Sequence, residues 1–300
     1  MSFIITMVSS SPEKPVGQRH IDEAIHILDQ DNILLTCEPI WLDAGKAVDL
    51  GISEKPASGL MLNLMDFLEK TEIDVFLTDP DRRRKKLLLA DMDSTIVTGE
   101  MLDDLAEFAG LKDKISAITA MAMEGKLDFA GALRERVGLL KDLPIDALEK
   151  TFNEMKLSPG AKILVRTMRK AGAKCVLVSG GFTYFTEAVA GLVGFHNHHG
   201  NTLDIEKGKL TGKVKEPILD KFAKVDFLRT YVRDMKIRPD DTLTIGDGAN
   251  DIPMLKTAGL GIGYRPKEAV KKEIDNLILY GDLTTALYAQ GYTSKHFVDK

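Results

Sequence analysis

The strongest constraint on the fold is a series of five short apolar runs in the last two thirds of the sequence. They cover residues 87–91, 174–181, 242–248, 260–264 and 276–280. Each run has the length of one strand, and the intervals between runs are long enough for helices. Strands that are buried on both faces appear as continuous apolar runs, as in a parallel sheet covered by helices. The series therefore predicts an α/β fold with a doubly wound parallel sheet.

An insertion separates the first two runs, because an interval of about 80 residues is too long for one crossover helix. Helical patterns within it cover residues 104–109, 112–124, 128–140 and 145–155. We predict a helical cap over residues 98–157, inserted into a core that comprises residues 87–97 and 158–300. Where the chain returns to the core, Ser158 is expected to cap the next helix and Pro159 to occupy its first turn.

The N-terminal part predicts a separate α+β domain, residues 1–80. The expected strands are residues 3–8, 33–41, 47–52 and 73–78, and the expected helices are residues 20–30 and 57–70. This βαββαβ order is that of a ferredoxin-like sandwich, and we expect Trp41 to pack within this domain. Five cations, Arg82 to Lys86, then follow a turn. We interpret residues 81–86 as a solvated basic linker rather than as an anion-binding patch.

Charge and cysteine content exclude several classes of partner. The net charge is −5 and the pI is near 5.8, whereas proteins that neutralise nucleic-acid phosphates carry a basic surplus. Cys37 and Cys175 lie far apart and lack metal-ligand spacing, which fits a reducing cytoplasm. No apolar run is long enough to cross a membrane, and no signal peptide is evident. We therefore expect a cytoplasmic protein that acts on a small molecule, without nucleic-acid or membrane partners.

Three histidines, His196, His198 and His199, could suggest a metal site. No carboxylate or cysteine accompanies them at ligand spacing. We interpret them as an exposed loop that leads into a hairpin, with arms at residues 202–205 and 210–214.

Polar side chains gather where the predicted core strands end. Asp91 and Asp93 follow the first run, Ser179 and Gly180 end the second, and Asp247, Asn250 and Asp251 follow the third; Lys224 lies on the helix between. The carboxyl ends of parallel strands share one edge of a sheet, so we expect these groups to converge. Four carboxylates in one cleft need a cation, and Mg²⁺ prefers such oxygen ligands.

The remaining groups predict a phosphate site. Ser179, the Gly180 amide and Lys224 can hold anionic oxygens. Asp91, at the strand tip, is placed to attack phosphorus and form an aspartyl-phosphate. Asp93 can give a proton to the leaving oxygen and later take one from water.

The segments DMDST, Ser179, Lys224 and GDGAND together resemble, in their order, the signature motifs of the haloacid-dehalogenase-like phosphatases. Glu100, Met123, Phe129 and Arg136 make the chain similar, more narrowly, to the phosphoserine phosphatase family. The resemblance implies hydrolysis of O-phospho-L-serine, the last step of serine biosynthesis in that family. It also implies that Mg²⁺ is held by the Asp91 carboxylate, the Asp93 carbonyl and the Asp247 carboxylate.

Further roles follow from the same resemblance. Asn250 is expected to help hold the phosphoryl group, and Asp251 to steady Lys224. Glu100 can accept from the substrate ammonium, and Arg136 can bind its carboxylate with two parallel hydrogen bonds. Met123 and Phe129 would form an apolar lid that keeps bulk water out.

Two alternatives stay open. The substrate could be another small phosphate, such as phosphohomoserine or a sugar phosphate. The N-terminal domain is similar to amino-acid-binding ACT domains and could sense a ligand, although Ser9-Ser10-Ser11-Pro12 replaces the usual acidic, glycine-containing turn. A dimerisation surface is the structural alternative for this domain, so a homodimer is compatible with the sequence.

Overall fold

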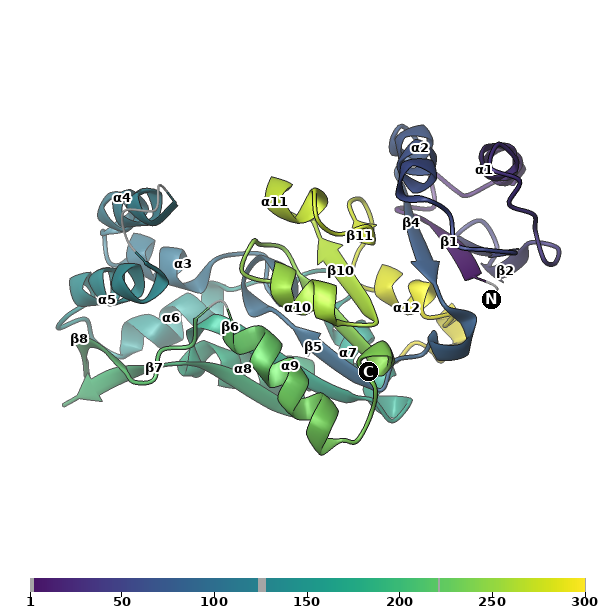
Figure 1. Ribbon diagram of the computed structural model, residues 1–300. Helices are drawn as coiled ribbons and strands as arrows, with labels where there is room; N and C mark the ends of the chain where they lie inside the picture. Colours follow the sequence, from purple (N-terminus) through teal and green to yellow (C-terminus); the bar gives the residue numbers. More distant parts are fainter. Residues whose placement is uncertain (1–2, 124–127, 221, 300) are drawn as a thin grey trace.

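The computed structural model describes residues 3–123, 128–220 and 222–299 (Figure 1). Its larger sheet has seven strands in the order β11-β10-β9-β5-β6-β7-β8. Neighbouring strands pair in parallel from β11 to β7, and β8 is antiparallel to β7. The prediction of a mostly parallel sheet is confirmed. Its strands are β5 (Leu87–Ala90), β6 (Lys174–Phe182), β7 (Asn197–Glu206), β8 (Lys209–Lys215), β9 (Thr242–Gly246), β10 (Leu260–Tyr264) and β11 (Leu277–Ile278).

Helices cover both faces of this sheet because alternate residues of each strand point to opposite sides. Leu88 and Ala90 of β5 pack into one apolar cluster, with side chains of α7 (Ala161–Lys170), α8 (Thr183–Val193) and α12 (Thr285–Ala289). Leu87 and Leu89 pack into a second cluster. That cluster includes side chains of α9 (Ala223–Asp234), α10 (Ile252–Thr257) and α11 (Glu268–Lys271). All four residues of β5 are fully buried, so the strand that leads into Asp91 lies at the centre of the molecule.

Four helices follow the first core strand, as the sequence predicts. They are α3 (Met101–Phe108), α4 (Lys112–Met123), α5 (Phe129–Leu139) and α6 (Asp146–Glu154). Together with the β7–β8 hairpin they lie at one end of the molecule (Figure 1). The backbone of Leu210 in β8 exchanges hydrogen bonds with Asp142 and Leu143, just beyond α5. The hairpin therefore supports the helices that stand over the carboxyl edge of the sheet.

The predicted helix start at Ser158 is wrong. Helix α7 begins at Ala161, and Gly160 precedes it with a left-handed φ of 80°. A Cβ at Gly160 would lie 2.8 Å from the backbone nitrogen of Thr284, so the chain needs glycine at this position. The carbonyl of Ser158 accepts from Ala161 N instead, which closes a turn before the helix.

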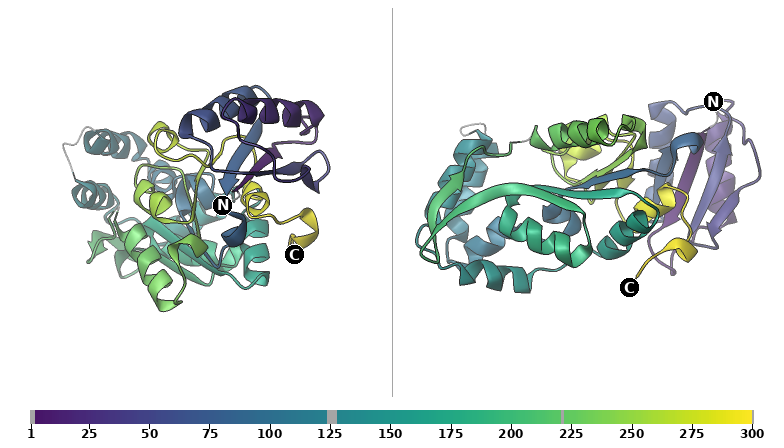
Figure 2. Two further views of the ribbon diagram at one scale, coloured as in Figure 1. Left: turned by 45° about the vertical axis from the view of Figure 1, so that its right-hand side comes forward. Right: turned by 90° about the horizontal axis from the view of Figure 1, so that it is seen from below.

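The N-terminal unit, residues 3–78, forms a second, antiparallel sheet in the order β2-β3-β1-β4. Its elements are β1 (Phe3–Ser9), α1 (Gln18–Asp29), β2 (Ile40–Asp43), β3 (Ala47–Ile52), α2 (Ser58–Glu69) and β4 (Ile73–Thr78). Figure 2 shows this unit at the end of the molecule opposite to the cap helices.

The prediction of a strand over residues 33–41 is largely wrong. The strand begins only at Ile40, and before it Leu35 makes one isolated bridge to Ile52. Pro39 has no N–H to donate to a ladder, which limits pairing at this edge. Trp41 pairs with Val48 in the N-terminal sheet and is 40% exposed, so only part of its side chain packs within this unit.

The basic segment, residues 82–86, is not a solvated linker. The guanidinium of Arg83 binds both carboxylate oxygens of Asp49, at 2.5 and 2.6 Å, and the hydroxyl of Thr6 at 2.7 Å. It also donates to the carbonyls of Tyr288 and Ala289 in α12. Lys85 is buried, and its ammonium donates to the Asp240 carbonyl at 2.7 Å. Arg83 therefore fastens the N-terminal unit to the core, and Lys85 fixes the connecting segment on the core.

A carboxylate supplies a second fastening. Asp74, in β4, is buried and accepts from the backbone nitrogens of Leu279, Tyr280 and Gly281. Burial raises its pKa to about 6 despite these three donors. The contact between the N-terminal unit and the core therefore contains charged groups of both signs.

Of the three histidines, only His196 lies in the expected exposed loop, directly before β7. His198 and His199 lie in β7, paired with β6. The ring of His199 stacks on Phe227 and exchanges a 2.9 Å hydrogen bond with the Tyr231 hydroxyl, both in α9. These residues hold a helix on the sheet.

In the described part of the chain, no helix has the length and apolar character needed to cross a bilayer.

Candidate active site

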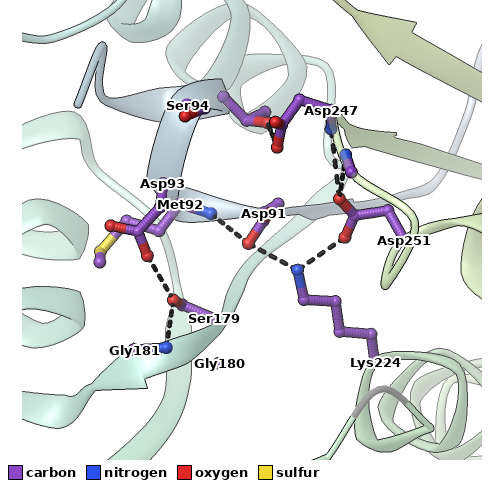
Figure 3. Close-up of polar contacts among 12 residues, drawn as sticks. Asp91, Met92, Asp93, Ser94, Ser179, Gly180, Gly181, Lys224, Asp247 and Asp251 are labelled. Carbon is purple, nitrogen blue, oxygen red and sulfur yellow. Dashed lines mark hydrogen bonds and ion pairs between the residues drawn. The ribbon is translucent and has the colours of Figure 1, made fainter. Parts of the chain in front are cut away.

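The carboxyl edge of the central strands collects the predicted polar groups (Figure 3). Asp91 follows β5 directly, and its backbone nitrogen still donates to Ile245 O in the neighbouring β9. The chain then makes a tight turn over Met92–Ile96, in which Ser94 has a φ of 55°. This turn ends the strand and aims Asp93 toward the tip of β6.

Asp93 is held by groups from two elements. Its Oδ2 accepts from the Ser179 hydroxyl at 2.9 Å, and its Oδ1 accepts from Met101 N, the first amide of α3, at 2.9 Å. The cap therefore contributes directly to the position of this carboxylate. The Ser179 hydroxyl also accepts from Gly181 N at 2.8 Å, so its orientation is fixed from both sides.

Lys224 lies between two carboxylates. Its ammonium is 2.6 Å from Asp91 Oδ1 and 2.6 Å from Asp251 Oδ1. The second oxygen of Asp251 accepts from the backbone nitrogens of Asp247 and Gly248, so Asp251 also shapes the loop after β9. A Cβ at Gly246 would lie 2.4 Å from Asp251 Cγ. Only glycine allows this close approach.

Asn201 is a supporting residue that the sequence did not reveal. It is buried in β7; its amide nitrogen donates to Gly180 O at 2.7 Å, and its Oδ1 accepts from Leu219 N at 2.7 Å. It thereby ties the strand end that carries Ser179 to the segment that leads into Lys224. An asparagine inside a strand carries no sequence signal for such a role.

A cavity of about 340 Å³ opens over these groups. It is lined by most of the predicted site residues, namely Asp91, Asp93, Glu100, Phe129, Arg136, Ser179, Gly180, Asp247 and Asn250. Lys224 and Asp251 do not line the cavity and lie behind Asp91. Met123 ends α4, and its side chain is outside the described residues. The cavity is also lined by Thr119 and Lys267, which the sequence analysis missed.

The far end of the cavity belongs to the cap. Phe129, at the start of α5, packs over the backbone of Gly180, where a Cβ would come within 3.2 Å of its ring. Arg136 donates through Nε to Ala132 O at 3.2 Å, and its terminal nitrogens have no partner among the described residues. Glu100 accepts from the Ser94 hydroxyl at 2.8 Å. A cation and an anion thus stand opposite the strand ends.

Burial shifts the pKa values of the carboxylates upward. For Asp91, burial and then the nearby Asp251 raise the pKa well above its ordinary value, against the effect of Lys224. For Asp93, burial and then Glu100 raise the pKa to about 6. Burial also raises the pKa of Asp247, with Lys267 opposing the shift. The cleft therefore disfavours its own negative charge and favours an additional cation.

The donor set fits a divalent ion. Asp91, Asp247 and Asp251 each offer one oxygen, and these oxygens lie within 4.8 Å of one another. Lys224 already pairs with Asp91 and Asp251, which leaves Asp247 and the second oxygen of Asp91 as the stronger candidates. Carboxylate oxygens in this arrangement suit Mg²⁺, which binds through one or two carboxylates and completes its shell with water and substrate oxygens.

Comparisons with known proteins agree with this geometry. Residues 88–256 match the model of the family described as haloacid dehalogenase-like hydrolase. A phosphoserine phosphatase from Archaeoglobus fulgidus is 41% identical over 77% of this chain and 67% of its own length. One from Lactococcus lactis is 42% identical over 72% of this chain and 96% of its own.

A solved structure of a phosphoserine phosphatase is also similar to this chain. The structure described as a phospho-aspartyl intermediate analogue of phosphoserine phosphatase is 39% identical, with a TM-score of 0.63. The match covers 68% of this chain and 98% of that one.

Proposed function

Since this chain belongs to the haloacid dehalogenase-like hydrolases, and to the phosphoserine phosphatases within them, we propose that it hydrolyses O-phospho-L-serine to L-serine and phosphate. One observation carries the proposal. The Asp91 carboxylate lies 2.6 Å from the buried ammonium of Lys224 and lines a cavity that Glu100 and Arg136 also line. Phosphate, ammonium and carboxylate of one small substrate each meet a group of suitable charge.

The reaction proceeds in two displacements. An Asp91 oxygen attacks phosphorus, the bond from phosphorus to the serine oxygen breaks, and protonated Asp93 gives its proton to that oxygen. Asp93, now a carboxylate, takes a proton from water, which attacks the aspartyl-phosphate and releases phosphate from Asp91. A pKa of about 6 suits Asp93 to both transfers near neutral pH.

The phosphoryl oxygens are proposed to be held by the Ser179 hydroxyl, the Gly180 amide and Asn250, whose residues line the cavity with Asp91. For this the Ser179 hydroxyl would exchange its hydrogen bond to Asp93 for one to the substrate. Lys224 adds a fixed positive charge behind the reacting centre. Its pKa, which burial alone would lower, is raised by Asp251 and Asp91, so it stays charged. Such preorganised donors stabilise charge that develops during phosphoryl transfer.

We assign the divalent ion as Mg²⁺, held by the carboxylates of Asp91 and Asp247 and the carbonyl of Asp93. When bound, it neutralises phosphoryl oxygens and keeps Asp91 ionised for attack. The arrangement of oxygens around Asp91 and Asp247 supports this assignment.

At the other end of the substrate, Glu100 is proposed to accept from the ammonium and Arg136 to bind the carboxylate. Phe129 is proposed to exclude bulk water, and Met123 is proposed to share this role. Phosphohomoserine is the alternative substrate: it keeps both charged groups but is one methylene longer.

For the N-terminal unit we propose an ACT-like, ferredoxin-like domain over residues 1–80. Its element order and its sheet order, β2-β3-β1-β4, support this assignment. The hydroxyl of Ser9, the last residue of β1, donates to the carbonyls of Ser11 and Lys14 and so supports the first loop. Together with the ionic contacts to the core, this favours a structural role over amino-acid sensing.

The function is tested by phosphate release from phosphoserine in the presence of Mg²⁺. Asp91→Asn keeps the shape of the side chain but removes the nucleophile, so we expect kcat to fall by at least roughly 10³-fold. Acid quenching with ³²P-labelled substrate should leave label on wild type and none on the variant. Asp234→Asn serves as the control and should stay near wild type, because the side chain of Asp234 is 58% exposed at the end of α9, where it pairs with Arg233.

Two outcomes would contradict the proposal. One is an Asp91→Asn variant that keeps more than a tenth of the wild-type rate. The other is a wild-type kcat/KM for phosphohomoserine above that for phosphoserine, which would assign the longer substrate instead.

A further inference from the structure

Lys267 lies at the same edge of the sheet as the catalytic carboxylates, three residues beyond β10. Its backbone nitrogen donates to the Asp247 carbonyl at 2.8 Å, and its ammonium lies 3.1 Å from Asp247 Oδ2. The main chain thus places this side chain beside one of the proposed ion-binding carboxylates.

The ammonium of Lys267 also reaches the cap. It lies 3.6 Å from Glu100 Oε1, immediately before α3. It is therefore a positive charge between a carboxylate of the core and a carboxylate of the cap. In the sequence it is one lysine among many, but the fold places it inside the cavity.

The two lysines near the acidic cluster differ in their freedom to move. The side chain of Lys224 is 4% exposed and pairs at 2.6 Å with both of its partners. The side chain of Lys267 is 59% exposed, and its pairs are longer. Lys267 can therefore leave its carboxylates for solvent at little cost, whereas Lys224 cannot.

We propose that Lys267 neutralises Asp247 in the ion-free enzyme and competes with the divalent ion for the Asp247 carboxylate. A divalent ion on Asp247 would repel an ammonium 3.1 Å from the same carboxylate, so ion binding has to displace Lys267. The inference rests on the ion site of the proposed function. It predicts that this enzyme binds its ion less tightly than its carboxylates alone would allow.

The test measures the affinity of the metal-free protein for Mn²⁺. Electron paramagnetic resonance monitors the binding, in the absence of substrate. Lys267→Met removes the competing charge and keeps the aliphatic stem, so we expect Mn²⁺ to bind roughly three- to tenfold more tightly. Lys267→Arg retains the charge and should stay close to wild type. Lys271→Met is the matched control, since Lys271 pairs with Glu268, away from the site.

Equal or weaker Mn²⁺ binding by Lys267→Met would overturn the inference. Thermal unfolding with and without Mn²⁺ checks the fold: the rise in Tm on adding the ion should be larger in Lys267→Met than in wild type. If wild type binds no Mn²⁺, the ion site fails and this inference with it. If wild type binds Mn²⁺ but does not hydrolyse phosphoserine, only the proposed activity fails.

Discussion

At the scale of single residues, we propose that Arg136 recognises the substrate carboxylate. We predict that Arg136→Ala raises KM for phosphoserine by roughly 10- to 100-fold, because a charge-assisted pair is worth about 1.5–3 kcal/mol. O-phosphoethanolamine keeps the phosphate and the ammonium but has no carboxylate, so its KM should change by less than about threefold. Steady-state kinetics on both substrates measure the difference. Equal losses on the two would show that Arg136 supports the cap rather than the carboxylate.

The residues that the sequence identified and those that it missed differ in how the fold brings them to the site. Asp91 and Asp247 directly follow core strands and Ser179 lies near the carboxyl end of β6, so the shared edge of parallel strands makes their meeting predictable. Asn201 lies within a strand and Lys267 follows β10, where many other lysines of the chain could equally have been placed. Their roles depend on which side chains face them across the fold, and local pattern does not contain that information.

At the scale of elements, the segment between the N-terminal unit and β5 shows where charge pattern misleads. A run of five cations predicts a solvated segment. Arg83 instead pairs with Asp49, and their side chains are only 11% and 8% exposed. The alternation of apolar runs predicted the core strands to within a few residues, because those strands are buried on both faces. The edge strand β2 has no such constraint, and its start was predicted seven residues too early.

The buried ion pair of Arg83 and Asp49 leads to a prediction at this scale. Arg83→Met leaves Asp49 buried without its partner, and breaking such a pair costs about 3–5 kcal/mol. Urea denaturation should show the free energy of unfolding fall by that amount. Lys86→Met is the control, because the side chain of Lys86 is 60% exposed, and it should cost less than about 1 kcal/mol. A similar small loss for both variants would mean that the Arg83 contacts do not hold the N-terminal unit.

At the scale of the whole molecule, the acidic cleft makes the ion-free protein sensitive to pH. Asp93 has a pKa of about 6 when folded, against about 3.9 when unfolded. Between these values the folded state binds more protons, so stability is greatest at low pH and is lost as pH rises through 6. We expect Asp93→Asn, which removes this titration, to gain stability relative to wild type by about 2 kcal/mol between pH 4 and pH 7.

The measurement is thermal or urea unfolding of both proteins in EDTA across that range. Repeating it with Mg²⁺ should reduce the difference, since the ion favours the ionised cluster. A stability difference that does not change with pH would show that Asp93 titrates near its ordinary value.

The contacts of Arg83 and Asp74 join parts of the chain that are about 205 residues apart. At translation rates of about 5–20 residues per second, the N-terminal unit leaves the ribosome roughly 10–40 s before residues 279–289 are made. Its sheet can fold in that time, but its docking surface stays in water, with Asp49 and Asp74 hydrated and charged. Docking of the N-terminal unit therefore has to wait until the chain has been made as far as residue 289. A ribosome that stalls before this point would leave the unit with nothing to dock against.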